Sequence, residues 1–417
     1  MRTFLLGSFL LIATMVHAQR ACLSSEYLAK QVAEDASFNN KMADIEKFIQ
    51  FSTGTSNTIL STARAGAEMI IKIPVVVHVV YYKQDQNISD EQIKSGIEAL
   101  NRDFRKNNYD TVNTPARFKN VAADVQIEFY LATADPRGRS TTGIVRKQTS
   151  VADFNMDDKI KFSSHGGSDA WDSKSYLNIW VGTLRNLLGY SSSPGSEPSK
   201  DGIVISNKAF GTINVQGQYN MGRTAVHEAG HWLGLKHTWG DTYCGDDFVD
   251  DTPKQGGYTM GCPTSFRTSC SNGDLGDMYM NFMDFTDDAC MSLFTVGQKN
   301  RMRSLFNDGG PRFSLLLSKG LDEPWLAESP LPVPEEVPQK TEIKIFPNPA
   351  VNELTLILSE NWVGKEVRIQ GLTGVVLQRI RISSVNTKIS IGGFTPGVYI
   401  ITGEASGEKI RNKFIKL

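Results

Sequence analysis

The chain has 417 residues, with 44 basic and 45 acidic side chains and a formal net charge of −1. This length is enough for two or three domains with a full hydrophobic core. The even charge balance argues against a nucleic-acid-binding surface, and the ordinary composition leaves the substrate class open.

The N-terminus has the parts of a secretory signal peptide. Arg2 precedes an apolar run over residues 4–15, and the small residues Val16 and Ala18 follow. We predict cleavage after Ala18, which makes residues 1–18 the signal peptide. The apolar run is too short to span a membrane and no other stretch is long enough, so no transmembrane segment is expected.

Residues 19–64 are predicted to form a polar, partly helical propeptide. Between Ser24 and Ile49, apolar side chains recur at helical spacing. A Ser-, Thr- and Gly-rich stretch follows over residues 51–66 and is typical of an exposed linker. Arg64 in this linker is a candidate processing point.

The pattern over residues 65–320 predicts an α+β domain. A nearly continuous β-branched run at residues 70–81 is typical of a central strand buried on both faces. Ser89 is a good N-cap for a helix that continues through Phe104. Further strands are expected at residues 125–131, 176–181 and 201–206.

Residues 186–193, between the last two of these strands, have two interpretations. In one, they form an exposed edge strand to which an extended peptide adds through backbone hydrogen bonds. In the other, they form a simple loop. The sequence alone does not choose between them.

The most specific pattern in the chain is H-E-x-x-H-x-x-G-x-x-H, from His227 to His237. His227 and His231 are four residues apart and share one face of a helix, where two imidazoles can bind one metal ion. Gly234 can adopt positive φ and turn the chain, so that His237 returns as a third ligand. Three nitrogen ligands leave a fourth position open, as in a catalytic zinc site. Glu228 is the candidate general base, because it lies beside the metal and can take a proton from a water molecule.

Four cysteines lie in a long irregular segment after this motif, at positions 244, 262, 270 and 290. They contain no C-x-x-C pair, which argues against a second zinc site. In an oxidising compartment they favour two disulfides, and all three pairings are open. A last helix of this domain is expected at residues 295–305.

The C-terminal part of the chain has a different character. Residues 321–340 contain five prolines and are predicted to be a semi-rigid linker. Residues 341–417 alternate in short strand-like runs separated by Gly, Asn and Pro, which predicts a small all-β sandwich of about seven strands.

Four motifs occur in order between residues 227 and 298, within a stretch of about residues 70–305 that resembles one known family. They are the zinc pattern continued by Thr238-Trp239, the run from Asp247 to Pro253, the run from Asn281 to Cys290, and the run from Phe294 to Gln298. Together they resemble the pappalysin (cytophagalysin) family of metzincin metalloproteases, of the ulilysin and mirolysin type. The resemblance implies a zinc endopeptidase that acts on peptide and protein substrates. It also implies a twisted mixed sheet with helices above the cleft and an irregular lower half.

The resemblance assigns structural roles in the lower half. Met283 matches the Met-turn methionine, which forms an apolar floor under the zinc. Carried to matching positions, the disulfides of the family would be Cys244–Cys270 and Cys262–Cys290.

A calcium site is also implied by the resemblance. Asp247, Asp250 and Thr252 match its oxygen ligands, and closely spaced carboxylates with a hydroxyl suit this hard cation. The alternative is a solvated acidic loop without an ion.

Two positions depart from the family pattern. Phe285 stands where the family usually has Tyr, two residues after Met283, so a hydroxyl that approaches the zinc or the oxyanion is missing. Loss of one such donor can cost about 10²–10³ in rate. Ala289 stands where some members have an acid for a basic P1′ side chain, so that preference is not carried over. Asp287 and Asp288 lie nearby as substitutes.

Cys22 lies in the propeptide of residues 19–64, here called the leader, and resembles a cysteine switch. Its thiolate would occupy the open zinc position until the leader is removed, and thiolate is a good zinc ligand. The alternative is a free or accidental thiol.

The C-terminal domain resembles the type A sorting domain of type IX secretion. The residues that carry this resemblance are 345–350 (Ile-Phe-Pro-Asn-Pro-Ala), 396–399 (Pro-Gly-Val-Tyr) and the final 413–417. It implies the type IX machinery as a partner, passage through the periplasm of a Gram-negative bacterium, and then release or surface attachment. A substrate-binding sandwich is the structural alternative.

These observations together predict a secreted zinc endopeptidase that is made as a zymogen, with Zn²⁺ and Ca²⁺ as cofactors. The competing class is a binding or adhesion protein that keeps the zinc but has weakened catalysis, because of Phe285. A metal-storage protein is excluded, since the histidines form one ordered site rather than a His-rich tract.

Overall fold

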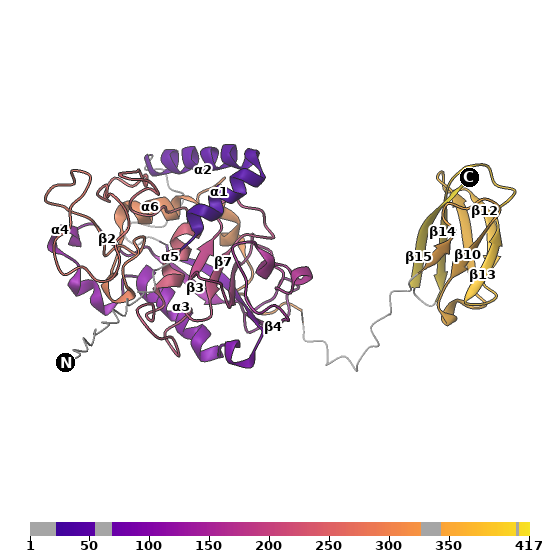
Figure 1. The fold of residues 1–417 in the computed structure, drawn as a ribbon, viewed down its shortest axis with the longest axis horizontal. Helices are drawn as coiled ribbons and strands as arrows, with labels where there is room; N and C mark the ends of the chain where they lie inside the picture. Colours follow the sequence, from indigo (N-terminus) through magenta and orange to yellow (C-terminus); the bar gives the residue numbers. More distant parts are fainter. Residues whose placement is uncertain (1–21, 55–68, 327–342, 406–407) are drawn as a thin grey trace, which may run out of the picture. The chain divides into compact units, whose positions relative to one another are not determined.

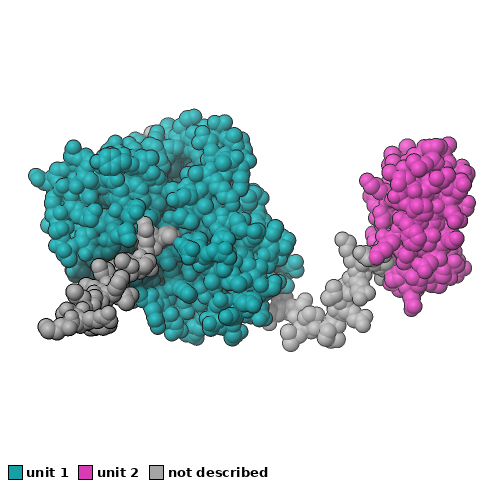
Figure 2. All heavy atoms as spheres, in the orientation of Figure 1, with its two compact units in different colours: residues 1–328 teal, residues 329–417 magenta. Residues whose placement is uncertain are grey.

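The computed structural model describes residues 22–54, 69–326, 343–405 and 408–417. The chain divides into two compact units, residues 1–328 and 329–417 (Figure 2). The predicted signal peptide, Arg64 and most of both predicted linkers lie outside the described residues. Among the residues that are described, no helix is both long and apolar enough to cross a membrane.

The first unit is built on a mixed sheet with the strand order β3-β1-β5-β7-β6, and β4 also pairs with β1. Its strands are β1 (Ile71–Tyr81), β3 (Ile127–Leu131), β4 (Ile144–Gln148), β5 (Leu177–Gly182), β6 (Gly189–Ser191) and β7 (Ile203–Ser206). All pairs are parallel except β6 with β7. The segment with two interpretations is therefore an edge strand, and the continuous apolar run of β1 lies at the centre of the sheet as expected.

Two helices cover one face of this sheet. They are α3 (Asp90–Phe104), which begins at the N-cap Ser89, and α5 (Arg223–Trp232), which carries the zinc pattern. Alternate residues of β1, such as Val75 and Val77, face a core that includes Ala225 and Ala229 of α5. The opposite face contributes Val80, Trp180 and Val204 to a separate core. The sheet therefore holds α5 at a fixed place under the edge strand β6.

The leader forms two helices, α1 (Ser24–Glu34) and α2 (Ala36–Gly54), drawn in indigo in Figure 1. Helix α1 packs on the edge strand β6, and α2 packs on α6 (Val296–Ser304). Arg301 of α6 forms a salt bridge with Glu46 of α2 and also donates to the backbone oxygen of Gly234 at 2.9 Å. The leader is thus tied to the end of the motif helix.

The part of the first unit after α5 is mostly irregular. Disulfides join Cys244 to Cys270 and Cys262 to Cys290. Among the described residues there, regular structure consists of helix α6 and a few short elements. One of these is β8 (Phe294–Thr295), which pairs with β2 (Ala122–Ala123). The two disulfides therefore stabilise a segment that contains little helix or strand structure of its own.

The end of the first unit extends into residues assigned to the linker. Thr133 donates to the backbone oxygen of Asp322 at 2.9 Å, and the backbone N–H of Leu326 donates to Gly138 at 2.9 Å. Residues 321–326 therefore lie on the first unit.

The second unit is a small sandwich with its own apolar core. Its strands are β9 (Lys344–Phe346), β10 (Glu353–Ile357), β11 (Glu366–Gly371), β12 (Val376–Arg381), β13 (Asn386–Ser390), β14 (Gly397–Ala405) and β15 (Glu408–Lys416). They form a three-stranded sheet, β13-β10-β9, and a four-stranded sheet, β12-β11-β14-β15. Trp362, Ile369 and Phe414 are fully buried between the sheets. The all-β prediction for this region is confirmed.

Candidate metal centre

The motif helix α5 is buried along its whole length. Arg223 at its first turn is fully buried and binds Asp103 at 3.1 Å and Asp110 at 2.9 Å, which anchors the start of the helix. At its end, Gly234 has φ +81° and the N–H of Leu235 returns to the oxygen of Gly230. A left-handed residue at this place ends a helix, and glycine takes it without strain.

This turn brings three imidazoles together. The Nε2 atom of His231 lies 3.1 Å from Nε2 of His227 and 3.1 Å from Nε2 of His237. The Sγ atom of Cys22 completes the group, and the four candidate ligand atoms lie within 4.8 Å of one another. All four residues are buried, so the leader cysteine reaches the same point in space as the three predicted ligands.

Hydrogen bonds to the Nδ1 atoms test whether this group suits a metal. His227 Nδ1 lies 2.7 Å from the oxygen of Phe282, and His231 Nδ1 lies 2.9 Å from the oxygen of Leu235. His237 Nδ1 lies within hydrogen-bond distance of Asp241. Because each Nδ1 atom faces an acceptor, it carries the ring proton. A neutral imidazole with its proton on Nδ1 has a lone pair on Nε2, and the three Nε2 lone pairs point toward one another.

The electrostatics agree with this arrangement. Burial, followed by the nearby His237, lowers the pKa of His231 to about 3, so its ring is neutral. Converging lone pairs without protons between them need a cation. The donor set of three imidazoles and a thiol fits zinc.

A methionine lies directly under the motif helix. Met283 is fully buried, and a Cβ atom placed on Gly230 would lie only 2.4 Å from its Sδ atom. Glycine at position 230 is therefore required for this close packing.

The leader also contacts the candidate general base. Glu228 is buried, and Ser24 Oγ donates to its Oε2 atom at 2.8 Å. The same Ser24 oxygen accepts the backbone N–H of Ser191 in the edge strand at 2.9 Å. Cys22 itself forms a parallel bridge with Gly189 of that strand. The leader thus reaches the three histidines, the Glu228 carboxylate and the edge strand β6 at the same time.

Phe285 forms an apolar wall beside the metal group. Its ring centroid lies 4.8 Å from that of His237 and 5.0 Å from that of Trp239. Tyr258 packs on the outer side of Phe285, at 5.4 Å between centroids. Phe285, Trp239 and Cys22 form one small buried cluster.

The residues near the predicted P1′ position have separate roles. Ala289 is exposed. Asp288 is fully buried and accepts the N–H groups of Met221 and Arg223 at the start of α5. Its carboxylate therefore serves the motif helix, which argues against its use for a basic substrate side chain.

The three residues of the predicted calcium site lie on one loop but in different environments. Thr252 donates to Asp247 Oδ2 at 2.7 Å, and both side chains are buried, whereas Asp250 is exposed. Burial raises the pKa of Asp247 to about 7.

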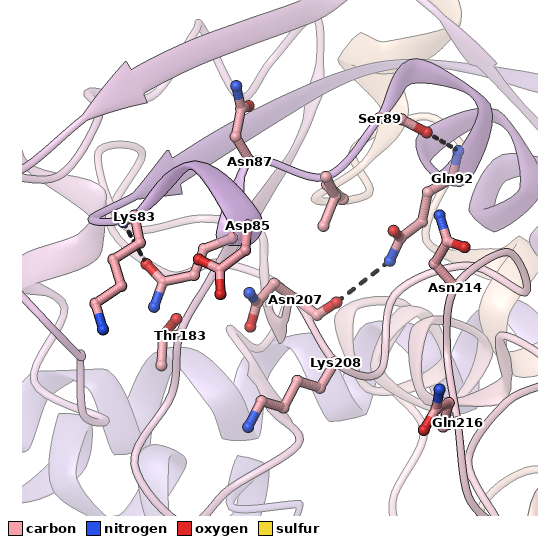
Figure 3. A pocket seen from close by; sticks show the side chains of 12 residues that line it. Lys83, Asp85, Asn87, Ser89, Gln92, Thr183, Asn207, Lys208, Asn214 and Gln216 are labelled. Atoms are coloured by element: carbon pink, nitrogen blue, oxygen red, sulfur yellow. Dashed lines mark hydrogen bonds between the residues drawn. The ribbon is translucent and has the colours of Figure 1, made fainter.

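A separate polar cavity of about 850 Å³ is drawn in Figure 3, and its lining includes residues that follow the ends of β1, β5 and β7 in the chain. Its labelled side chains include Lys83, Asp85, Asn207 and Lys208. None of the metal-group residues lines it.

Sequence reasoning missed Ser24 and Asp241. Asp241 carries a weak signal, since an acid four residues after a histidine ligand can serve as its hydrogen-bond partner. Ser24 carries none, because its contact with Glu228 joins residues that are 204 positions apart.

Comparisons with known proteins agree with this geometry. Residues 162–307 match the family model Peptidase M43, described as pregnancy-associated plasma protein-A. An extracellular metalloprotease of Arthroderma benhamiae is 32% identical over 253 residues, which cover 58% of this chain and 81% of the relative. The chain belongs to the pappalysin family. It is a metalloendopeptidase.

Solved structures of this family resemble the first unit. Mature mirolysin of Tannerella forsythia, in complex with a cleaved peptide, is 50% identical and has a TM-score of 0.59, with 60% of this chain and 97% of that chain covered. A promirolysin mutant of the same organism is 45% identical and has a TM-score of 0.64, with 72% and 97% covered. The match to promirolysin fits a pappalysin made as a zymogen.

Residues 344–417 match the secretion system C-terminal sorting domain. This match confirms the predicted sorting domain and shows a chain that is secreted or displayed at the cell surface.

Proposed function

We propose that this pappalysin hydrolyses peptide bonds with His227, His231 and His237 as zinc ligands and Glu228 as the general base. A zinc ion held there would polarise the scissile carbonyl and make the attacking water more acidic. The observation that supports this proposal most directly is the convergence of three Nε2 atoms whose Nδ1 atoms each have an acceptor.

Glu228 moves the proton in this scheme. Its carboxylate accepts a proton from the attacking water and later gives it to the leaving amine. Its place on α5, one residue after His227, keeps it beside the metal group. A Cβ atom built on Gly189 of the edge strand would lie 3.1 Å from Glu228 Oε1, so a peptide along β6 passes next to this carboxylate.

The variant Glu228→Ala tests the general base. We expect cleavage of a fluorogenic peptide by the leader-free enzyme to fall at least about 10²–10⁴-fold, the usual contribution of a general base. Zinc content should stay at that of the wild type, because the three ligands are intact. Glu98→Ala, at an exposed position of α3, is the matched control. Undiminished cleavage by Glu228→Ala would contradict the mechanism.

The proposed zymogen is held inactive by the leader. Cys22 acts as the fourth ligand of the metal, and Ser24 holds the Glu228 carboxylate. Burial and then the Glu228 carboxylate hold the pKa of Cys22 well above its usual value, so a thiolate at this place needs a cation beside it. Cleavage after residue 64 is the proposed start of activation.

Calcium is proposed at Asp247, Asp250 and Thr252. Asp247 is buried and its pKa is raised, because the hydrogen bonds from the protein do not offset the cost of burying the charged carboxylate. A bound cation would offset this cost. Because protons and Ca²⁺ compete for this carboxylate, we expect Ca²⁺ to raise the melting temperature more at pH 8 than at pH 6. Asp247→Asn should remove this difference in a thermal melt. An equal calcium effect at both pH values would contradict the assignment.

The route of export is proposed to run through the periplasm of a Gram-negative bacterium. The signal peptide expected at residues 1–18 would direct the first step, and the sorting domain would engage the type IX machinery.

The alternative function is a zinc-retaining binding protein with weakened catalysis, which the missing hydroxyl at Phe285 favours. A peptide cleavage assay of the leader-free protein, with and without a chelator, separates the two. Chelator-sensitive turnover supports the endopeptidase, and peptide binding without turnover supports the alternative.

A further inference from the structure

A buried polar cluster on the face of the sheet opposite to α5 has no role in the proposed reaction. Tyr27 of helix α1 donates from its hydroxyl to both carboxylate oxygens of Asp158, at 2.9 and 2.8 Å. Lys161 forms a salt bridge with Asp158 at 2.9 Å and donates to the Tyr27 hydroxyl at 3.3 Å. The Lys161 side chain is fully buried.

Aromatic rings surround this ion pair. The ring of Tyr27 lies 4.9 Å from the ring of Tyr190. The Lys161 Nζ atom lies 4.8 Å from the Tyr27 ring, 5.0 Å from the Tyr190 ring and 5.5 Å from the Trp180 ring. Cation–π contacts of this kind are strongest when water is excluded. The Tyr27 side chain is therefore contacted at its ring by Lys161 and Tyr190 and at its hydroxyl by Asp158.

The protonation of Tyr27 is fixed by this environment. Burial, followed by the Asp158 carboxylate, raises the pKa of Tyr27. The hydroxyl therefore stays protonated and acts as a donor to Asp158.

Only Tyr27 of this cluster belongs to the leader. Its other members lie between residues 158 and 190, in the part of the first unit that stays when the leader is removed. When the leader leaves, Lys161 keeps its bond to the oxygen of Lys200 at 2.7 Å and its salt bridge. Asp158 loses both bonds from the phenol. The place of Tyr27 becomes a slot with an aromatic wall and a carboxylate that keeps a long bond of 3.5 Å from the Tyr190 hydroxyl but has lost the two shorter bonds from Tyr27.

The slot borders the edge strand at the metal group. Side chains along a strand point alternately to its two faces. Gly189 faces Glu228, and Cys22 at the metal group pairs with it. Tyr190, the next residue, faces the slot. A peptide that pairs with β6 therefore directs every second side chain to the face of the sheet on which Tyr190 lies.

We propose that the slot occupied by Tyr27 becomes a substrate subsite that selects a tyrosine side chain within about two residues of the scissile bond. This inference rests on the proposed release of the leader. A site built to bind a hydroxyl rejects the analogue without it far more strongly than an apolar pocket does, because its polar groups are left without partners. The selectivity should therefore distinguish tyrosine from phenylalanine.

The test uses the leader-free wild-type enzyme. A cleaved peptide without tyrosine is chosen from a mixed library, and Tyr, Phe or Leu is then placed at each of two positions on either side of the cut bond. We expect kcat/KM for Tyr to exceed that for Phe about tenfold at one of these positions. Equal cleavage of the Tyr and Phe peptides at all positions would overturn the inference.

The double variant Asp158→Asn/Lys161→Met assigns the selectivity to the slot. It replaces the buried pair by neutral groups, so no single buried charge is left behind. We expect the Tyr-to-Phe ratio to fall toward one, while the Leu peptide is still cleaved. A folded double variant that keeps the full ratio would overturn the location; if it does not fold, the wild-type comparison decides. Chelator-sensitive cleavage of the Leu peptide tests the proposed function separately from the subsite.

Discussion

Two leader side chains act on two different parts of the metal centre. Cys22 reaches the group formed by the three histidines, and Ser24 hydrogen-bonds the Glu228 carboxylate. Loss of the Cys22 side chain removes its hydrogen bond to Ser24 at 3.4 Å, but Ser24 keeps its own bonds to Glu228 and to the backbone of Ser191. Latency should weaken stepwise rather than disappear with a single substitution.

The variant Cys22→Ala tests this arrangement. We expect the uncut chain to show at least about tenfold more peptide cleavage than wild type, since a loss of about 1.4 kcal/mol in leader binding already gives that factor. Adding Ser24→Ala should raise the rate further. Mass spectrometry during the assay must show that the leader is still attached. An uncut Cys22→Ala chain as inactive as wild type would argue against a cysteine switch.

Single residues differ in how far the sequence predicts them. The spacing of His227, His231 and His237 follows from helix geometry and a glycine turn, so local pattern is sufficient. The contacts of Ser24 and Tyr27 join the leader to residues more than 100 positions away, and no local pattern encodes them.

Helix α2 is held to the rest of the first unit by Ile49, which is buried in its hydrophobic core, and by a partly buried salt bridge between Glu46 and Arg301. Burial alone would raise the pKa of Glu46, but the hydrogen bonds and charge of Arg301 outweigh it and the pKa lies below its ordinary value of 4.5. A depressed carboxyl pKa stabilises the folded state above the ordinary pKa, and this stabilisation is lost as pH falls through the lower value. Docking of α2 should therefore weaken in acid.

The variant Glu46→Gln tests this contact. We expect it to destabilise docking of α2 by about 1–3 kcal/mol at pH 7, because Arg301 loses a charged partner. Hydrogen exchange of α2 measures the effect. Asp44→Asn is the control, because Asp44 lies on the same helix in an exposed pair with Lys47. The difference between wild type and Glu46→Gln should shrink as pH falls below 4.5. A difference that is independent of pH would contradict the role of the charge.

Elements with a strong period were predicted well, and those that depend on tertiary contacts were not. The apolar run of β1 and the capped start of α3 are local signals. Helix α2 continues to Gly54, into the stretch assigned to a linker, because Ser52 is buried and Thr53 bonds back to Ile49. The three-residue strand β6 is too short for a clear pattern, and its pairing with β7 decides its conformation.

The two units have separate cores. One core joins the sheet of the first unit to α3 and α5, and the other lies between the two sheets of the second unit. Since the cores share no residue, each unit should unfold in its own transition.

Deletion of residues 343–417 tests this independence. The melting temperature of the first unit should change by less than about 2 °C, because a change outside its core has only a small effect on stability. Trp362→Ala in the full chain is the companion variant: this fully buried side chain supports only the second core, so it should lower only the second transition. Scanning calorimetry resolves both. Export should fail for the deletion while the purified protease stays active. A fall of the first transition by more than about 5 °C would show that the sorting domain stabilises the protease.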